Sequence, residues 1–412
     1  MTLLDRLSDK SAWRDFLEYK SSLACPKELV RELKKFIDEE SYLPVCRRIA
    51  EGADFPLPRK AVISKQHSQK KRVVYTYPPA ENMVLKLLTH LLLRRYDGLF
   101  SENLYSFRPG RNAKDAIRKL TAIPGIDKLH SYKVDISNYF NSIPIPMLLP
   151  KLRAALSDDP ALCAFLERLL TEEHIIERGH IAAEEKGIMA GTPISSFLAN
   201  LYLRELDAWF YARRIPYARY SDDIILFAPT REETEAHAAF IRDYLAGAGL
   251  SVNPAKEQFT SPGEGWVFLG FSYKNGIVDI APVSIQKLKK KMRRKARALA
   301  RWSERNGIEP DRAAKAFIRI FNRKLLENAA DNELTWSYWF FSVINTADGL
   351  REIDRYAQDC LRFLLSGKRT KARFSVRYED MKKLGYRNLV HEYYGYMGAE
   401  KESAAQQDEQ KT

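Results

Sequence analysis

The spacing of apolar residues divides the chain into helical and strand-like stretches. Over residues 1–50, apolar positions recur three and four apart, as at Leu29, Leu33 and Ile37, which is typical of amphipathic helices. Similar patterns predict helices at about 80–97, 146–172, 187–212 and 230–247, and strands at 62–78, at 131–143, around residue 222 and at 266–280. This mixture predicts an α+β fold, in which an antiparallel sheet carries helices on one face.

The pattern also predicts four parts, with boundaries at 1–54, 55–281, 282–398 and 399–412. The first is helical, the second is mixed, and the third is helical, basic and rich in aromatic residues. Within the third part, residues 284–305 hold ten basic residues and one acid, and Ile285, Leu288, Met292, Leu299 and Trp302 fall near one helical face. The polar tail has nothing to bury and is expected to be disordered.

The composition indicates which binding partners and which cellular compartment to expect. A formal net charge of +14 favours polyanions, nucleic acid first and an anionic membrane surface second. The four cysteines are scattered with no CxxC pair, so neither a zinc site nor a disulfide framework is predicted. The start of the chain acquires charge too early for a signal peptide, and no apolar run reaches membrane-spanning length. We therefore expect a cytoplasmic protein without membrane attachment.

Two adjacent aspartates, Asp222 and Asp223, precede the apolar run 224–228, which is typical of a buried strand. Adjacent aspartates in a turn are often only solvated, but burial beside a strand is costly unless a cation compensates the charge. Asp135 follows another strand-like stretch, and the two strands side by side would bring all three carboxylates to one edge. Oxygen ligands favour Mg²⁺ or Mn²⁺, and two such ions about 4 Å apart suit phosphoryl transfer.

Several motifs resemble those of one enzyme family. YSDD (220–223) resembles the YxDD box of reverse transcriptases, VDISNYFNSI (134–143) their first catalytic motif, and GIMAGTPISSFLANLYLRELD (187–207) their template-and-nucleotide motif. LYSFRPGRNAKDAI (104–117) is similar to the finger motif of group II intron and retron enzymes, while GLSVNPAKEQF (249–259) and VFLGF (267–271) fall where the next two palm motifs belong. The resemblance implies a right-hand polymerase, with fingers and palm over 55–281 and a basic helical thumb over 282–398.

The resemblance also implies residue roles. Asp135 and Asp222 would ligand two Mg²⁺ ions (or Mn²⁺), Asp223 would support them, and Lys256 would protonate the leaving pyrophosphate. Phe140 would exclude a ribose 2′-hydroxyl. The remaining nucleotide-binding candidates are Lys70, Arg72, Ala190 and Gly191. The nucleic-acid-binding candidates are Arg108 (template contact or finger brace), Tyr220, the primer-grip residues Phe268, Leu269 and Gly270, and the helix residues Lys289, Lys290, Arg293, Arg294 and Arg297.

The family implies RNA-directed DNA polymerisation from deoxynucleoside triphosphates. The compact layout resembles stand-alone bacterial enzymes of the retron and phage-defence groups, which use a dedicated structured non-coding RNA as template. One departure is Ala190, which stands where the family usually has a glutamine that touches the nucleotide. This departure keeps open an untemplated or protein-primed DNA polymerase. A separate alternative is an RNA-binding scaffold with a vestigial site. The sequence also leaves a homo-oligomer open.

Overall fold

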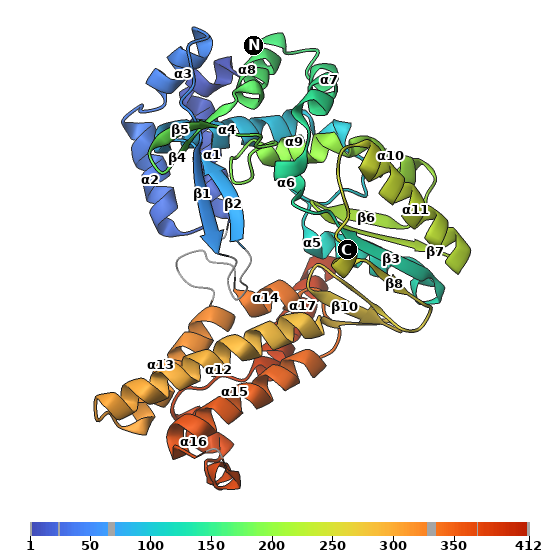
Figure 1. Ribbon diagram of the computed structural model, residues 1–412. Helices are drawn as coiled ribbons and strands as arrows, with labels where there is room; N and C mark the ends of the chain where they lie inside the picture. Colours follow the sequence, from blue (N-terminus) through green and yellow to red (C-terminus); the bar gives the residue numbers. More distant parts are fainter. Residues whose placement is uncertain (1, 24, 65–70, 328–334, 369, 410–412) are drawn as a thin grey trace. The chain divides into compact units, whose positions relative to one another are not determined.

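The structure is a computed structural model that describes residues 2–23, 25–64, 71–327, 335–368 and 370–409. The chain forms two compact units. Unit 1 comprises residues 1–23 and 27–262, and unit 2 comprises residues 24–26 and 263–412. Each unit has its own sheet structure and its own helices, and each is described by itself below (Figure 1).

Unit 1 contains most of the elements. Its helices are η1 (Asp5–Ser8), α1 (Lys10–Ser22), α2 (Lys27–Asp38), α3 (Leu43–Ala50), α4 (Pro79–Arg95), η2 (Asp97–Leu99), α5 (Ala113–Thr121), η3 (Ile126–Lys128), α6 (Tyr139–Ser142), α7 (Ile145–Ala155), α8 (Pro160–Thr171), α9 (Ser195–Tyr202), α10 (Arg204–Ala212), α11 (Arg231–Gly247) and η4 (Pro254–Lys256). Its strands are β1 (Arg59–Ser64), β2 (Lys71–Thr76), β3 (His130–Asp135), β4 (His174–Glu177), β5 (His180–Ala183), β6 (Tyr217–Tyr220), β7 (Asp223–Ala228) and β8 (Gln258–Thr260).

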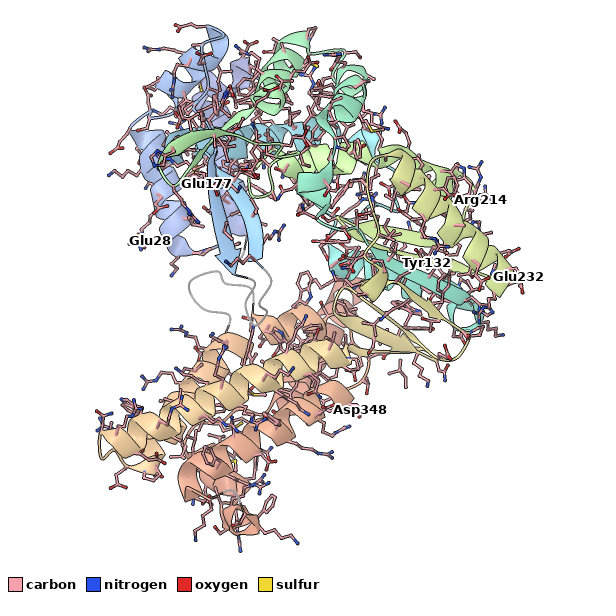
Figure 2. The ribbon with its side chains drawn as sticks, viewed as in Figure 1. Glu28, Tyr132, Glu177, Arg214, Glu232 and Asp348 are labelled. Atoms are coloured by element: carbon pink, nitrogen blue, oxygen red, sulfur yellow. The ribbon has the colours of Figure 1, made fainter. Side chains whose placement is uncertain are left out.

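The sheet that matters most for function has the strand order β6-β7-β3-β8 and is antiparallel throughout. Helices α10 and α11 pack on this sheet (Figure 1). Strand β7 is buried from Ile224 to Ala228, as its apolar run predicts. Tyr132, labelled in Figure 2, lies on the central strand β3 and donates a hydrogen bond to Glu257 Oε1 at 2.7 Å. The sheet is therefore held on the side of β8 by a buried tyrosine as well as by backbone pairing.

A second sheet of unit 1 has the order β2-β1-β4-β5, with β1 and β2 antiparallel from Arg59↔Thr76 to Ser64↔Lys71. Helices α4 and α9 lie in the core of this unit. Helix α4 begins at Pro79, where the missing N–H costs nothing. The α4 residues Val84, Leu87 and Leu88 are completely buried. This packing makes α4 a core helix rather than a surface one.

Unit 2 contains a three-stranded sheet and a set of helices. The strands are β9 (Trp266–Phe268), β10 (Phe271–Lys274) and β11 (Ile277–Ile280), in the order β11-β10-β9. The helices are α12 (Pro282–Arg305), α13 (Pro310–Leu325), α14 (Trp336–Phe341), α15 (Asp348–Ser366), η5 (Lys371–Ser375), α16 (Tyr378–Lys383) and α17 (Leu389–Glu409). Strands and helices in both units confirm the α+β class.

Two details of unit 2 differ from the sequence pattern. Ile285, Met292 and Leu299 of α12 are buried as expected, but the Trp302 side chain at the end of this stripe is 42% exposed. Helix α17 has helical backbone as far as Glu409, within the stretch expected to be disordered. Its Ala, Glu, Gln and Lys residues are strong helix formers, which accounts for this helical backbone. None of the described helices combines the length and the apolar character that a membrane crossing requires.

Candidate active site

Strand register brings Asp135, Asp222 and Asp223 to one edge of the β6-β7-β3-β8 sheet. Asp135, the last residue of β3, lies directly opposite Asp223, the first residue of β7. Directly opposed residues of an antiparallel pair project their side chains to the same face. Asp222 lies in the two-residue loop between β6 and β7, and its carbonyl accepts a hydrogen bond from the Ile136 N–H at 3.0 Å. Backbone pairing therefore brings these three residues to one edge of the sheet.

The carboxylates of this edge are crowded and short of positive charge. Burial raises the pKa of Asp222, and the neighbouring Asp135 carboxylate raises it further. Burial and the charge of Asp222 raise the pKa of Asp223 to about 6. One cation is already present, because Lys256 Nζ lies 2.5 Å from Asp135 Oδ2. Lys256 is placed by the turn η4, whose Asn253 N–H donates to the Asp135 carbonyl at 2.8 Å.

The donor set fits a hard divalent cation. Among the described residues, no three His, Cys, Asp or Glu side chains are already arranged as a metal site. Mg²⁺ sites in phosphoryl-transfer enzymes commonly use one or two carboxylates together with substrate phosphates and water, so a preformed protein cage is not required. Asp135 and Asp222 supply such carboxylates. A bound dication would relieve the electrostatic repulsion between them.

A buried polar network that the sequence analysis did not single out supports the hairpin. Arg219 and Asp207 are both completely buried. Arg219 Nε donates to Asp207 Oδ1 at 2.8 Å and Arg219 Nη2 to Asp207 Oδ2 at 2.5 Å. Burial alone would lower the pKa of Arg219, but the Asp207 carboxylate outweighs burial and raises it. The pair links α10 to β6, immediately before the residues of the hairpin loop.

The same network holds the loop residue Ser221 in a costly conformation. Ser221 has φ +61°, a region that favours glycine. Its carbonyl accepts from Arg219 Nη1 at 3.2 Å, and its N–H donates to the hydroxyl of Ser106 at 2.9 Å. Ser106 in turn is fixed by Asn200 of α9, whose side chain donates to the Ser106 carbonyl at 2.8 Å. Both backbone groups of the strained residue therefore have buried partners.

A signal for this network was present in the sequence. Arg219 and Asp207 lie in or next to motifs that were quoted as family signatures, and a charged residue before an apolar strand has to be paired if it is buried. The partner could not be identified from spacing, because Asp207 and Arg219 are joined only through the packing of α10 on β6.

The loop before α9 makes close backbone contacts with two neighbouring segments. A Cβ on Gly187 would lie 2.6 Å from the Phe140 carbonyl oxygen, and one on Gly191 would lie 2.9 Å from the Tyr75 carbonyl oxygen. Both glycines also have positive φ, +53° and +103°. Asn141 bridges the segments, since its side chain accepts from the Ala190 N–H at 2.9 Å and donates to the Val73 carbonyl at 3.2 Å.

The backbone of Ala190 links the loop before α9 to Asn141 and to β2. Its N–H donates to Asn141, its carbonyl accepts from the Tyr75 N–H at 2.8 Å, and only 3% of its surface is exposed. The methyl group offers no donor to a nucleotide, unlike the glutamine that the family usually has here. Gly191 next to it allows β2 to approach closely. The structure thus places these two predicted nucleotide-binding residues in the loop before α9, where they pack against β2.

Phe140 lies at the start of the short helix α6, following the left-handed turn residue Asn138 (φ +46°). The Phe140 ring packs edge-to-face on Phe107, with ring centroids 6.2 Å apart. Phe107 is 39% exposed and has φ +58°, so it is held in an unfavourable conformation beside the predicted steric gate. Two aromatic rings, rather than one, therefore border this part of the site.

The three predicted finger residues differ in their surroundings. Arg108 is buried and donates to both Asp97 carboxylate oxygens, at 2.7 and 2.9 Å, and to the Ser101 carbonyl at 2.6 Å. These contacts give Arg108 a bracing role within the protein, the second of its two expected roles, while the template contact stays a prediction. Arg72 lies on β2 and is exposed. Lys70 lies outside the described residues.

The predicted primer-grip residues form a tight hairpin in unit 2. Leu269 and Gly270 are the two loop residues between β9 and β10, and both have positive φ, +50° and +89°. This combination is that of a type I′ turn, which suits the twist of a hairpin. The Phe268 ring is completely buried, and the contact of this hairpin with a primer stays a prediction. Tyr220, also predicted to bind nucleic acid, is the last residue of β6 in unit 1 and is partly exposed.

The basic residues of α12 do not all face solvent. Lys290, Arg293, Arg294 and Arg297 are exposed. Lys289 instead turns toward α15, where it forms an ion pair with Glu352 and lies 5.4 Å from the centre of the Tyr356 ring. Lys289 thus has an acidic partner within unit 2, and its binding of nucleic acid stays a prediction.

Comparison with known proteins agrees with this geometry. Residues 63–273 match the family described as Reverse transcriptase (RNA-dependent DNA polymerase). Protein YkfC of Escherichia coli is 24% identical over 254 residues, 52% of this chain and 66% of that protein. The group II intron-encoded protein LtrA of Lactococcus lactis is 22% identical over 223 residues, 53% of this chain and 36% of that protein. The chain thus covers less than two thirds of the length of either relative.

Among solved structures, telomerase from Candida tropicalis in complex with a fragment of telomeric RNA aligns with 79% of this chain and 63% of its own, at 9% identity and a TM-score of 0.46. The family match is the stronger finding, because it spans just over half of the 412 residues and includes every strand of the sheet that carries the three aspartates. With its antiparallel palm sheet and surrounding helices, the chain has the right-hand polymerase fold and belongs to the reverse transcriptase family.

Proposed function

We propose that the chain is an RNA-directed DNA polymerase that extends a primer with deoxynucleotides on an RNA template. The observation that carries the proposal is the register of β3 and β7, which opposes Asp135 to Asp223 and leaves Asp222 at the tip of the adjoining hairpin. Family membership supports the reaction type, and the crowded carboxylates support a requirement for divalent cations.

In this proposal, Asp135 and Asp222 would hold two Mg²⁺ ions, which would supply the positive charge that a primer 3′-hydroxyl and a triphosphate need for phosphoryl transfer. Asp223 adds negative charge that strengthens the site. The polar network beneath the hairpin keeps Asp222 in position, so that little reorganisation is needed during the reaction. Lys256, which lies against Asp135 at the same edge of the sheet, is our candidate for protonating pyrophosphate. Exposed Arg72 is our candidate for gripping the triphosphate.

The exposed cations of α12 support a nucleic-acid partner for unit 2. Phosphate neutralisation by several Lys and Arg residues gives salt-dependent binding without sequence preference. We further propose that the template is a dedicated structured non-coding RNA and that the enzyme acts in phage defence in the cytoplasm. These last points are supported only by the resemblance of the compact layout to stand-alone bacterial reverse transcriptases.

The test is primer extension with the purified chain, an RNA template of defined sequence and all four deoxynucleotides. We expect a complementary DNA product that requires Mg²⁺ and is absent with Asp222→Asn. The matched control is Asp243→Asn, an exposed aspartate of α11 outside the site, which should extend as wild type does. Full extension by Asp222→Asn would refute the assigned catalytic centre.

A second candidate function is untemplated addition of deoxynucleotides by the same centre. It is favoured by Ala190, whose buried methyl leaves no side-chain donor at a position where the family usually has a glutamine. Sequencing the product distinguishes the two functions: a templated product matches the supplied RNA, whereas an untemplated product has a composition that does not change when the RNA is changed.

A further inference from the structure

A pocket in unit 2 has the chemistry of a nucleotide site. It lies between α12, α15 and η5 and has a volume of about 320 Å³, close to the lower end of the range for small-molecule sites. Its lining includes Arg293 and Arg297 of α12, Tyr356 and Phe363 of α15, and Arg373 of η5. Asp348, labelled in Figure 2, marks the start of α15. None of these residues belongs to the carboxylate site in unit 1.

The seam between α12 and α15 changes character along its length. At one level, Lys289 is paired with Glu352. One turn further along both helices, Arg293 meets Tyr356 instead of an acid, and Arg297 follows after another turn. Among the described residues, neither Arg293 nor Arg297 has a carboxylate within ion-pair distance. The α12–α15 ion pair of Lys289 with Glu352 is therefore not repeated for Arg293 and Arg297 in the pocket.

The single acid of the pocket does not offset these two arginines. The Asp359 carboxylate receives a hydrogen bond from Arg362 Nη1 at 3.4 Å and lies 3.9 Å from Arg373 Nε. Arg293 and Arg297 both act on the Tyr356 hydroxyl: burial raises the pKa of Tyr356, and the two guanidinium charges oppose that rise. The pocket thus keeps a net positive charge beside two aromatic side chains.

Guanidinium groups bind phosphate with a fork of donors, and aromatic faces stack on nucleobases of any sequence. A single nucleotide carries one phosphate and one base, which matches a pocket that has arginines beside aromatic side chains. We propose that this pocket binds one nucleotide, with its phosphate on Arg293 and Arg297 and its base against Tyr356 and Phe363. The nucleotide belongs either to a single-stranded nucleic acid or to the free pool, and the test separates these sources.

The test measures binding to the full chain by calorimetry in the presence of EDTA. Without divalent cations the carboxylates of unit 1 disfavour phosphate at the polymerase site, and the pocket variants below show whether the binding resides in unit 2. The probes are AMP, adenosine, inorganic phosphate and a short 5′-phosphorylated oligoadenylate. We expect saturable AMP binding at one site, with adenosine and phosphate each at least tenfold weaker. An oligoadenylate much tighter than AMP would assign the nucleotide to a strand, and equal affinities would assign it to the free pool.

Variants locate the binding. The double variant Arg293→Gln/Arg297→Gln should weaken AMP binding at least tenfold, and so should Tyr356→Leu, whereas Tyr356→Phe keeps the ring and should bind as wild type does. The matched control, Lys295→Gln/Arg301→Gln, removes two exposed cations of the same helix that do not line the pocket and should change affinity less than twofold. Thermal unfolding verifies that each variant is folded.

Three results would overturn the proposal: no AMP binding, phosphate binding as tight as AMP binding, or equal losses in the arginine double variant and its control. Because binding is measured without metal and polymerisation is not, failure of this proposal leaves the primer-extension result untouched. Failure of primer extension likewise leaves the pocket measurable.

Discussion

The guanidinium of Arg219 and the carboxylate of Asp207 form a completely buried ion pair, joined by two hydrogen bonds of 2.8 and 2.5 Å, beneath the hairpin that carries Asp222. Removing one partner of such a pair leaves an uncompensated buried charge. We expect Arg219→Met to destabilise the protein by about 3–5 kcal/mol. Arg219→Met/Asp207→Leu should be more stable than either single variant, as measured by urea unfolding.

Activity should not follow stability in this series. The double variant still lacks the donor to the Ser221 carbonyl, so its kcat should remain low even where its folded fraction is restored. Arg219→Lys keeps the charge but loses the fork of donors and should lie between wild type and Arg219→Met in both properties. If the double variant recovered full kcat, the pair would be needed for folding only.

Divalent cations should stabilise the folded chain through the aspartate edge. Burial, together with the charge of the neighbouring carboxylates, raises the pKa of Asp222 and Asp223, so a bound dication removes a cost that the metal-free protein carries. Adding saturating Mg²⁺ should raise the melting temperature of wild type and of the exposed-site control Asp243→Asn. It should have little effect on Asp135→Asn/Asp222→Asn, whose own melting temperature in EDTA should exceed that of wild type. An equal Mg²⁺ response in all three proteins would place the metal elsewhere.

Phe140→Ala should relax the choice between deoxynucleotides and ribonucleotides. Removing the ring opens space where a 2′-hydroxyl would otherwise collide, so the ratio of kcat/KM for the two substrates should fall by about tenfold or more, equivalent to about 1.4 kcal/mol. Phe107→Ala removes the ring that packs against Phe140 and should give a smaller change in the same direction. Unchanged discrimination in Phe140→Ala would refute the steric-gate role.

The two glycines of the loop before α9 should tolerate no side chain. Gly187→Ala places a Cβ within 2.6 Å of backbone, and Gly191→Ala places one within 2.9 Å of backbone, each at positive φ. We expect losses of about 2 kcal/mol or more, because neither neighbour is a flexible side chain. Gly98→Ala is the control: its Cβ would meet nothing within 4 Å, and its stability should change by about 0.5 kcal/mol at most. Thermal unfolding of the three variants tests this contrast.

His90 should make the fold sensitive to acid. Its ring lies between Phe16 and Tyr19, and Arg94 Nη1 donates to His90 Nδ1 at 2.8 Å, which requires the neutral imidazole. Burial, together with the charge of Arg94, lowers the pKa of His90 to about 4. The unfolded chain, with a histidine pKa near 6.5, therefore binds more protons between pH 6.5 and 4, and stability falls as the pH falls through this window.

In His90→Phe that part of the acid sensitivity should disappear. The difference in melting temperature between wild type and variant should shift in favour of the variant as the pH is lowered from 6.5 to 4. His180→Phe, which changes an exposed histidine of β5, should keep the wild-type dependence on pH. A constant difference across this range would show that His90 does not titrate on unfolding.

Much of the sheet and its aspartates was predictable because local pattern and long-range pairing agree there. The apolar run after Asp223 allows only a buried strand, and the family motifs supplied its partner. The partners of charged side chains were not predictable. In the sequence, Arg108 and Lys289 cannot be told apart from exposed Lys and Arg residues. In the fold, Asp97 pairs with Arg108 and Glu352 pairs with Lys289. Such pairings depend on three-dimensional proximity, which spacing along one chain does not contain.

The opposition of Asp135 and Asp223 also determines which changes in chain length the site can survive. Side chains alternate between the two faces of a strand, so a one-residue deletion in β3 or β7 would move a carboxylate to the wrong face without altering any amino-acid type. The partly exposed His130, at the start of β3, can change identity with little consequence. Among natural variants, the palm strands should therefore be conserved in length more strictly than in composition, and insertions should collect in the connecting loops.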